Sequence, residues 1–176
     1  PERGAAFARA ATEYIEVQRF NADRAGARVN LGTFYGSRGE GPTGEVQLKA
    51  AIQLDRFFIP AYVNLADLYR AFGRDPDGER ILRQGLAVAP QNAALHYALG
   101  LALVRMTQST AALAELQRAY ELEPENTRFA YTYGVALHSA GKPDAAKATL
   151  AKVLARHPDD ATVRAALASF TKNEQP

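Results

Sequence analysis

Apolar residues recur along this chain every three to four positions, which is the spacing of short amphipathic helices. Small residues keep one register over most of the length: Gly32, Ala66, Gly100 and Gly134 follow one another at intervals of 34 residues. Because an uninterrupted period of this length is typical of stacked helical units, the pattern predicts a repeat protein. Ten helices are predicted, over about residues 3–20, 25–37, 43–54, 59–72, 76–87, 93–106, 110–121, 127–140, 143–155 and 160–171.

Glycine and proline divide the predicted helices into pairs. Gly39, Gly73 and Gly141 fall in the turn inside a pair, where a left-handed residue is least costly. A proline follows shortly after each of them, in the first turn of the next helix, where a missing N–H does no harm. The third pair lacks both residues, so Ser109 or Thr110 is expected to cap the helix that follows.

A further set of positions shares the same period. A leucine recurs at residues 48, 82, 116 and 150, small residues stand at 44, 78, 112 and 146, and a proline ends three of the four units. This pattern resembles the tetratricopeptide repeat (TPR), with its W-x2-L-G-x2-Y, A-x3-F and late proline. The departure lies at the position of the tryptophan, which is occupied here by Arg28, Tyr62, His96 and Ala130.

The resemblance implies an all-α fold, a right-handed superhelical α-solenoid of antiparallel helix pairs. It implies the second helix of an incomplete preceding repeat over residues 1–24, four repeats over 25–58, 59–92, 93–126 and 127–160, and a C-terminal capping helix and tail over 161–176. The four small residues at the 34-residue register are expected to be buried at helix contacts.

Composition excludes several classes of function. Net charge is only +2 and the basic residues are scattered singly, which does not favour a nucleic-acid partner. No apolar run is long enough for membrane insertion of this segment. Since the chain has no cysteine, it has no thiolate metal site and no haem-attachment motif.

Motifs with a chemical meaning are weak here. Residues 39–44 match G-x-G-x-x-G, but a predicted helix precedes them instead of a strand, so we interpret them as a glycine-rich turn. His96, His138 and His157 lie on separate elements and do not predict a metal site. No nucleophile stands beside a base or an oxyanion-hole signature. The sequence therefore predicts no catalytic residue, no metal and no cofactor.

In the TPR family the first helix of each repeat lines a concave groove. The resemblance predicts a peptide-binding groove formed by Asn30, Asn64, Asp67, Arg70, Tyr97, Leu101, Val104, Arg105, Arg128, Tyr131, Val135 and His138. Its first half is polar, and Asn30 and Asn64 are expected to hold main-chain amides of a peptide. Its second half is apolar, with Tyr97 and Tyr131 as anchors. Val29 and Thr33 replace the lysine and asparagine with which some TPR proteins clamp an acidic chaperone tail, so that partner is not expected.

These features favour a non-enzymatic protein–protein interaction module that binds a protein or peptide partner. The alternative is a structural segment that packs within a larger bacterial parent protein or self-associates through the N-terminal helix, where Phe7, Ala10 and Tyr14 have an uncovered face. A third hypothesis is that the chain is an enzyme or binds a small ligand.

Two segments, residues 14–32 and 60–69, also resemble bacterial TPR modules that follow multihaem cytochrome domains. That resemblance would imply a periplasmic compartment, and without it the compartment would be cytoplasmic.

Overall fold

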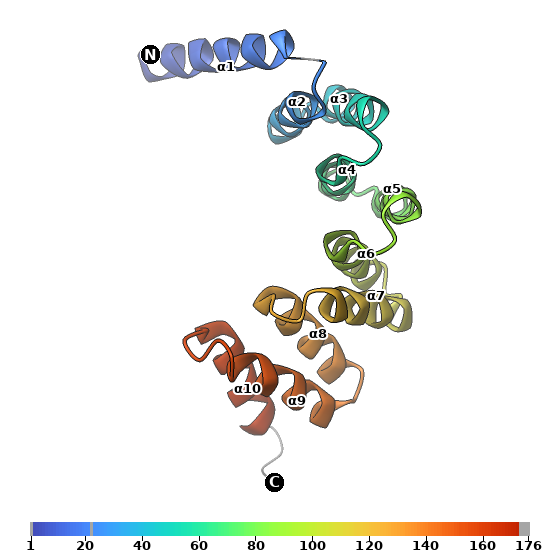
Figure 1. Cartoon of the computed structure of the whole chain (residues 1–176). Coiled ribbons are helices and arrows are strands. Elements are labelled where there is room, and N and C mark those ends of the chain that lie inside the picture. The colour runs from blue at the N-terminus through green and yellow to red at the C-terminus, as the bar shows by residue number, and fades with distance from the viewer. Residues whose placement is uncertain (1, 22, 173–176) are drawn as a thin grey trace. The chain divides into compact units, whose positions relative to one another are not determined.

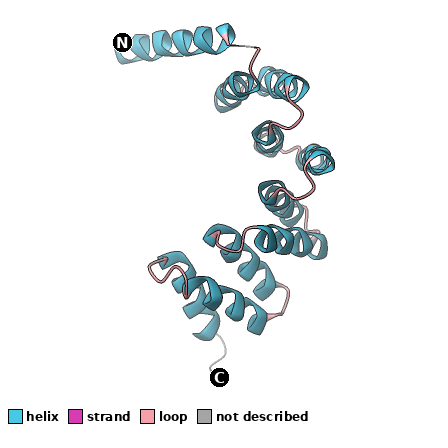
Figure 2. Ribbon diagram, viewed as in Figure 1, coloured by secondary structure: helices cyan, strands magenta, loops and turns pink. Residues whose placement is uncertain are grey.

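A computed structural model describes residues 2–21 and 23–172 of the chain. Within these ranges the protein contains ten helices and no strand (Figure 2). The prediction of an all-α solenoid of helix pairs is confirmed.

The helices lie close to their predicted ranges. They are α1 (Glu2–Phe20), α2 (Ala25–Ser37), α3 (Gly41–Leu54), α4 (Ile59–Ala71), α5 (Asp75–Val88), α6 (Ala93–Arg105), α7 (Ser109–Leu122), α8 (Thr127–Ser139), α9 (Pro143–Leu154) and α10 (Ala161–Lys172), labelled in Figure 1. No helix end differs from its predicted position by more than two residues.

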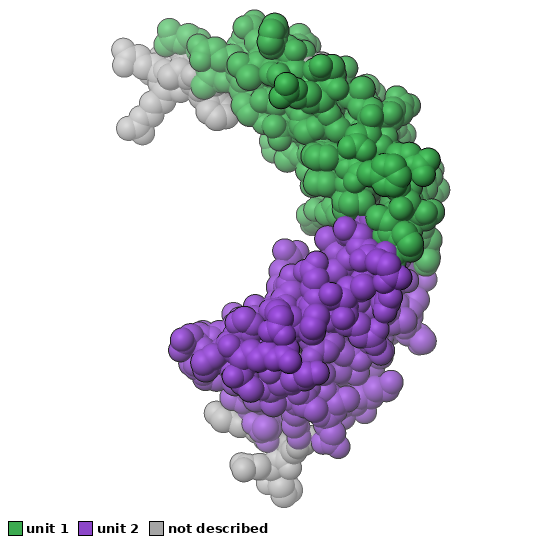
Figure 3. Space-filling model, in the orientation of Figure 1, with its two compact units in different colours: residues 1–90 green, residues 91–176 purple. Residues whose placement is uncertain are grey.

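The chain divides into two compact units, each described here by itself (Figure 3). Unit 1 is Pro1–Pro90 and holds α1 to α5, while unit 2 is Gln91–Pro176 and holds α6 to α10. The strongest contacts in both units join the two helices of a pair: α2 with α3, α4 with α5, α6 with α7, and α8 with α9.

Glycine lets the paired helices approach closely. A Cβ added to Gly100 would lie 2.7 Å from Cγ of Leu116, and one added to Gly134 would lie 2.8 Å from Cδ2 of Leu150. Both leucines are almost completely buried. The predicted burial of Gly32, Ala66, Gly100 and Gly134 is confirmed.

Left-handed residues close the turns inside the pairs, as predicted. Gly39, Gly73 and Gly141 have φ of 80°, 69° and 71°. The third pair places Thr107 in the same conformation, with φ of 59°. The prediction that Ser109 or Thr110 caps α7 is wrong, because both lie inside the helix and the N-cap is Gln108, whose side chain makes no capping bond. The chain therefore keeps one turn geometry in all four pairs and imposes it on a β-branched residue in the third.

Replacing Thr107 by glycine is expected to stabilise the protein. The left-handed conformation costs a residue with a Cβ about 1–2 kcal/mol, and glycine avoids this cost while losing some chain entropy. We expect Thr107→Gly to raise the free energy of unfolding by about 0.5–1 kcal/mol, measured by urea denaturation. The reverse change, Gly141→Thr, should lower it, and a loss of stability in Thr107→Gly would contradict this explanation.

A network of ion pairs and hydrogen bonds in unit 1 joins α3 to α4 and to Arg74, the N-cap residue of α5. Glu45 on α3 accepts hydrogen bonds from Tyr69 Oη at 2.9 Å and Arg74 Nη1 at 2.7 Å, and pairs with Lys49 Nζ at 2.6 Å. Burial opposes the charge, but the bonds from Lys49, Arg74 and Tyr69 outweigh it and lower the pKa of Glu45. Because the folded pKa is depressed, this stabilisation is present above the ordinary glutamate pKa and is lost as the pH falls through the lowered value.

Candidate functional site

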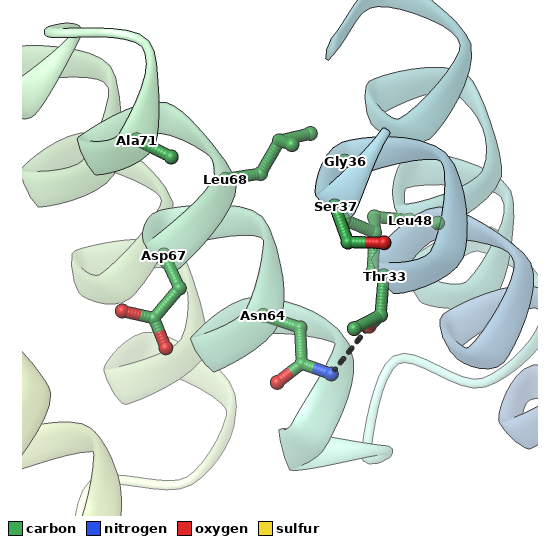
Figure 4. A pocket seen from close by; sticks show the side chains of 9 residues that line it. Thr33, Gly36, Ser37, Leu48, Asn64, Asp67, Leu68 and Ala71 are labelled. Atoms are coloured by element: carbon green, nitrogen blue, oxygen red, sulfur yellow. Dashed lines mark hydrogen bonds between the residues drawn. The ribbon is translucent and has the colours of Figure 1, made fainter. Parts of the chain in front are cut away.

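A pocket of about 260 Å³ lies between α2 and α4 in unit 1, with Leu48 of α3 at its base (Figure 4). We call it the unit 1 pocket. Thr33, Ser37, Asn64 and Asp67 contribute polar groups to a lining that is otherwise apolar. The full lining is Gly32, Thr33, Gly36, Ser37, Leu48, Asn64, Asp67, Leu68 and Ala71.

The polar side chains of unit 1 already have partners within the chain. Asn64 Nδ2 donates to Thr33 Oγ1 at 3.2 Å, which ties α4 to α2 (Figure 4). Asp67 accepts from Arg70 Nε at 3.3 Å on the exposed side of α4. Asn30 donates to Oε1 of Gln18 in α1 at 3.1 Å and does not line the pocket. Each of these bonds uses one N–H of an asparagine amide, which also carries a second N–H and an acceptor oxygen.

A second pocket, of about 220 Å³, lies between α6, α7 and α8 in unit 2, and we call it the unit 2 pocket. None of its lining residues carries a charge. Val104 at its edge keeps 49% of its surface exposed, whereas Leu116 at its base is buried. The full lining is Leu101, Val104, Ser109, Ala112, Leu113, Leu116, Thr132, Val135, Ala136, Ser139 and Ala140.

The two pockets occupy equivalent places in the repeating chain. Seven lining residues of the unit 1 pocket have their counterpart 68 residues later in the unit 2 pocket: Thr33 and Leu101, Gly36 and Val104, Leu48 and Leu116, Asn64 and Thr132, Asp67 and Val135, Leu68 and Ala136, Ala71 and Ser139. The repeat therefore sets the location of both pockets, while the side chains put an amide and a carboxylate, Asn64 and Asp67, in the unit 1 pocket and neither group in the unit 2 pocket.

Tyr97 belongs to the interior of unit 2, which corrects its prediction as an accessible anchor. Only 8% of its surface is exposed, and its ring stacks on Phe129 with the centroids 4.7 Å apart. The Tyr97 hydroxyl accepts a hydrogen bond from Nε of Arg128 at 3.0 Å, and the guanidinium lies over the ring. This position supports folding, and the side chain lines neither pocket.

The predicted groove residues separate into three groups. Leu101, Val104 and Val135 come together in the unit 2 pocket, and Asn64 and Asp67 in the unit 1 pocket. The others line neither pocket; these are Asn30, Arg70, Tyr97, Arg105, Arg128, Tyr131 and His138. Of these, Tyr131 packs partly buried against the core of unit 2, and His138 stacks on Phe170 at 4.1 Å.

Ala136 and its counterpart Leu68 are pocket residues that the sequence did not indicate. A comparison of residues 68 positions apart would have found the exchange of leucine for alanine at this place.

The described residues contain neither a cluster that could bind a metal ion nor a helix that could span a membrane. In residues 2–21 and 23–172, no three His, Asp or Glu side chains gather where they could hold a metal ion. Over the same part of the chain, no helix combines the length and apolar character that a membrane span requires.

Comparison with known proteins places the chain among helical repeat proteins. Residues 103–170 match the family model of the tetratricopeptide repeat. No curated protein matches the chain. The descriptions of three similar solved structures, TTC0263, PilF and YrrB, mention no cytochrome. The resemblance to TPR modules that follow multihaem cytochrome domains therefore stays a prediction.

Solved structures share the fold over most of the chain. A thermophilic TPR protein of Thermus thermophilus, TTC0263, is 22% identical with a TM-score of 0.73, over 96% of this chain and 94% of that one. PilF of Pseudomonas aeruginosa is 25% identical with a TM-score of 0.73, over 89% of this chain and 70% of that one. YrrB, described as a TPR protein with an unusual peptide-binding site, is 24% identical with a TM-score of 0.66, over 94% and 87%.

The matched residues lie in unit 2, and the 34-residue period carries the same pattern back through unit 1. Residues 103–170 thus match the tetratricopeptide repeat family, and the chain shares the fold of TPR proteins of known structure over most of its length.

Proposed function

We propose that the chain is a non-enzymatic protein–protein interaction module, and that the sides of α2, α4, α6 and α8 that carry the pockets bind an extended peptide or a helix. We call these sides the first-helix face of each unit. The unit 2 pocket is the observation that carries the proposal, because Leu101, Val104 and Val135 surround an uncharged cavity with an exposed apolar edge. Exposed apolar surface of this kind usually marks an interaction site.

The packing of the pocket walls supports binding. The pocket residues lie on helices that are packed into pairs, and buried leucines such as Leu116 fill the contact between the two helices of a pair. A partner would therefore meet a pre-formed surface. Because this surface is pre-organised, the chain loses little conformational entropy on binding. Ordering a flexible peptide still offsets much of the contact energy. We therefore expect micromolar affinity, about −8 kcal/mol.

The linings of the two pockets differ from that of an acid–base active site. General acid–base chemistry needs titratable groups positioned in a cleft, and no titratable residue lines the unit 2 pocket. The unit 1 pocket contains one carboxylate, Asp67, which is paired with Arg70 on the exposed side of α4.

Self-association is a second candidate, and α1 is the observation that favours it. Tyr14, Val17 and Phe20 on this helix are 39%, 57% and 90% exposed. By register Tyr14 corresponds to Leu48, which is 1% exposed. Ala10 is also exposed, and the side chain of Phe7 lies outside the described residues. A second copy of the chain would cover this face and remove its apolar surface from water.

A photo-cross-linking scan in the cells that make the protein separates the two candidates. A benzophenone amino acid is placed singly at Val104 on the first-helix face, at Val17 on α1, or at Val46, an exposed valine of α3 that lines neither pocket. The interaction module predicts adducts with another protein from Val104 and none from Val46. Adducts of twice the protein mass from Val17 alone would favour self-association and contradict the leading proposal.

A further inference from the structure

Helices α1 and α10 are complementary halves of a helix pair. By the 34-residue period, α10 is in line with the first helices α2, α4, α6 and α8, while α1 is in line with the second helices α3, α5, α7 and α9. Within unit 1 the described part of α1 contacts α2, and within unit 2 α10 contacts α8 and α9. Neither helix makes, within its own unit, the first-to-second-helix contact that is the strongest in every pair.

The positions that close a pair are exposed on these two helices. Val17 of α1 corresponds by register to Val153 of α9, and the two valines are 57% and 0% exposed. Ala168 of α10 corresponds to Ala66 of α4, and the first alanine is exposed while the second is buried. Because each comparison keeps the residue type, the exposure reflects what packs opposite the helix and not the residue itself.

Polar bonds join one fixed combination of register positions inside the pairs. Arg28 Nη1 on α2 donates to Gln47 Oε1 on α3 at 2.7 Å. The same positions 68 residues later carry His96 on α6 and Glu115 on α7, with 2.6 Å between Nδ1 and Oε2. A basic or ring nitrogen on the first helix thus meets an oxygen on the second helix in a pair of each unit.

Opposite charges occupy these positions on α10 and α1. The first-helix position is Arg164 and the second-helix position is Glu13, and both residues are exposed. Arg164 also donates through Nη2 to the carbonyl oxygen of Pro158, but a guanidinium has several N–H donors and this bond does not exclude a carboxylate. Glu16, one turn further along α1, corresponds to Lys152, which stays exposed in its pair. The register therefore gives α10 and α1 complementary charge as well as complementary shape.

We propose that α10 of one copy packs against α1 of a second copy and completes a further helix pair, with Arg164 beside Glu13 of the second copy. The contact removes the apolar surface of Val17 and Ala168 from water. Each copy keeps its other unpaired helix for a further copy, so association is head to tail and continues beyond a dimer unless it closes into a ring. This inference goes beyond the proposed function, because no residue of α1 or α10 lines either pocket.

Disulfide cross-linking tests the contact, since the chain has no cysteine of its own. By register Ala10 and Ala168 correspond to Gly78 and Ala66, and a Cβ added to Gly78 would lie 3.9 Å from the Cβ of Ala66, a separation that suits a disulfide. Ala10→Cys and Ala168→Cys proteins are mixed and oxidised at about 0.5 mM, because a single helix-pair contact is weak. We expect the mixed disulfide to exceed that of Val46→Cys with Ala168→Cys by about fivefold or more.

A charge exchange tests the register in the same assay. Arg164→Glu in the Ala168→Cys protein brings two carboxylates together and should lower the yield of mixed disulfide about threefold. Glu13→Arg in the Ala10→Cys protein should lower it likewise, and mixing the two reversed proteins should restore it. Circular dichroism of each variant checks that the helices are retained.

The results that would overturn the inference are specific. A mixed yield no greater than that of the Val46→Cys control would exclude the contact. Linkage of Ala10→Cys to itself as efficiently as to Ala168→Cys would show a symmetric contact of two α1 helices instead. Failure of the reversed pair to restore the yield would reject the register and the contact with it. None of these substitutions changes a pocket residue, so photo-adducts at Val104 test the proposed function separately.

Discussion

Replacing Tyr97 by alanine is expected to lower the free energy of unfolding by about 3–5 kcal/mol, as for other large buried aromatic residues. The ring is 8% exposed, stacks on Phe129 and lies beneath the guanidinium of Arg128, so its removal leaves a cavity and takes one contact from each of these two residues. Urea denaturation followed by circular dichroism measures the loss.

Tyr97→Phe is the matched control for this prediction. It keeps the ring and its stacking and removes only the hydroxyl that accepts from Arg128, so it should cost about 1 kcal/mol. If Tyr97→Ala unfolds at the same urea concentration as the unaltered protein, the ring is not part of the core. Because of this stability cost, Tyr97→Ala is unsuitable for testing peptide binding.

Two glycines at the same register should respond in opposite directions to the same substitution. A Cβ on Gly44 would meet the carbonyl oxygen of Gly32 at 2.8 Å, and backbone cannot move aside as a flexible side chain can. A Cβ on Gly78 would meet the carbonyl oxygen of Ala66 at 3.4 Å, an ordinary contact. We expect Gly44→Ala to cost about 1–3 kcal/mol by overpacking. Gly78→Ala should instead gain about 0.4–1 kcal/mol, because alanine favours the helix and restricts the unfolded chain.

Thermal and urea unfolding of the two single variants measure this contrast directly. Equal effects of Gly44→Ala and Gly78→Ala would show that the α2–α3 pair does not need a closer backbone approach than the α4–α5 pair. The closer approach follows from the residue opposite, which is Gly32 in one pair and Ala66 in the other.

The helices could be predicted from sequence because their ends depend on local chemistry. Turn glycines such as Gly39 and helix-starting prolines such as Pro143 act within a few residues, and the 34-residue period repeats the signal. The cap expected at Ser109 or Thr110 was wrong because Thr107 adopts the left-handed turn and α7 begins two residues later, at Ser109, as in the other pairs. Tertiary packing of the repeat thus overrides the residue preference at this turn.

The candidate site could be predicted only in part. Leu101, Val104 and Val135 come together because the spacing of residues in the sequence determines on which face of a helix each side chain begins. Spacing does not fix where a long side chain ends, and Tyr97 turns onto Phe129 instead of facing a partner. Pocket depth also depends on pairs from separate helices, such as Val104 with Ala136, which no single helix pattern reveals.

Isothermal titration tests most directly whether the first-helix face is the binding surface. The partner segment recovered by cross-linking is titrated into the unaltered chain, into Leu101→Ala/Val135→Ala, and into Leu54→Ala/Val46→Ala, which truncates two exposed apolar residues of α3. The interaction module predicts an affinity loss of about tenfold or more, near 1.4 kcal/mol, for the first pair and none for the second. Equal affinity in all three proteins, or a loss confined to the α3 pair, would contradict it.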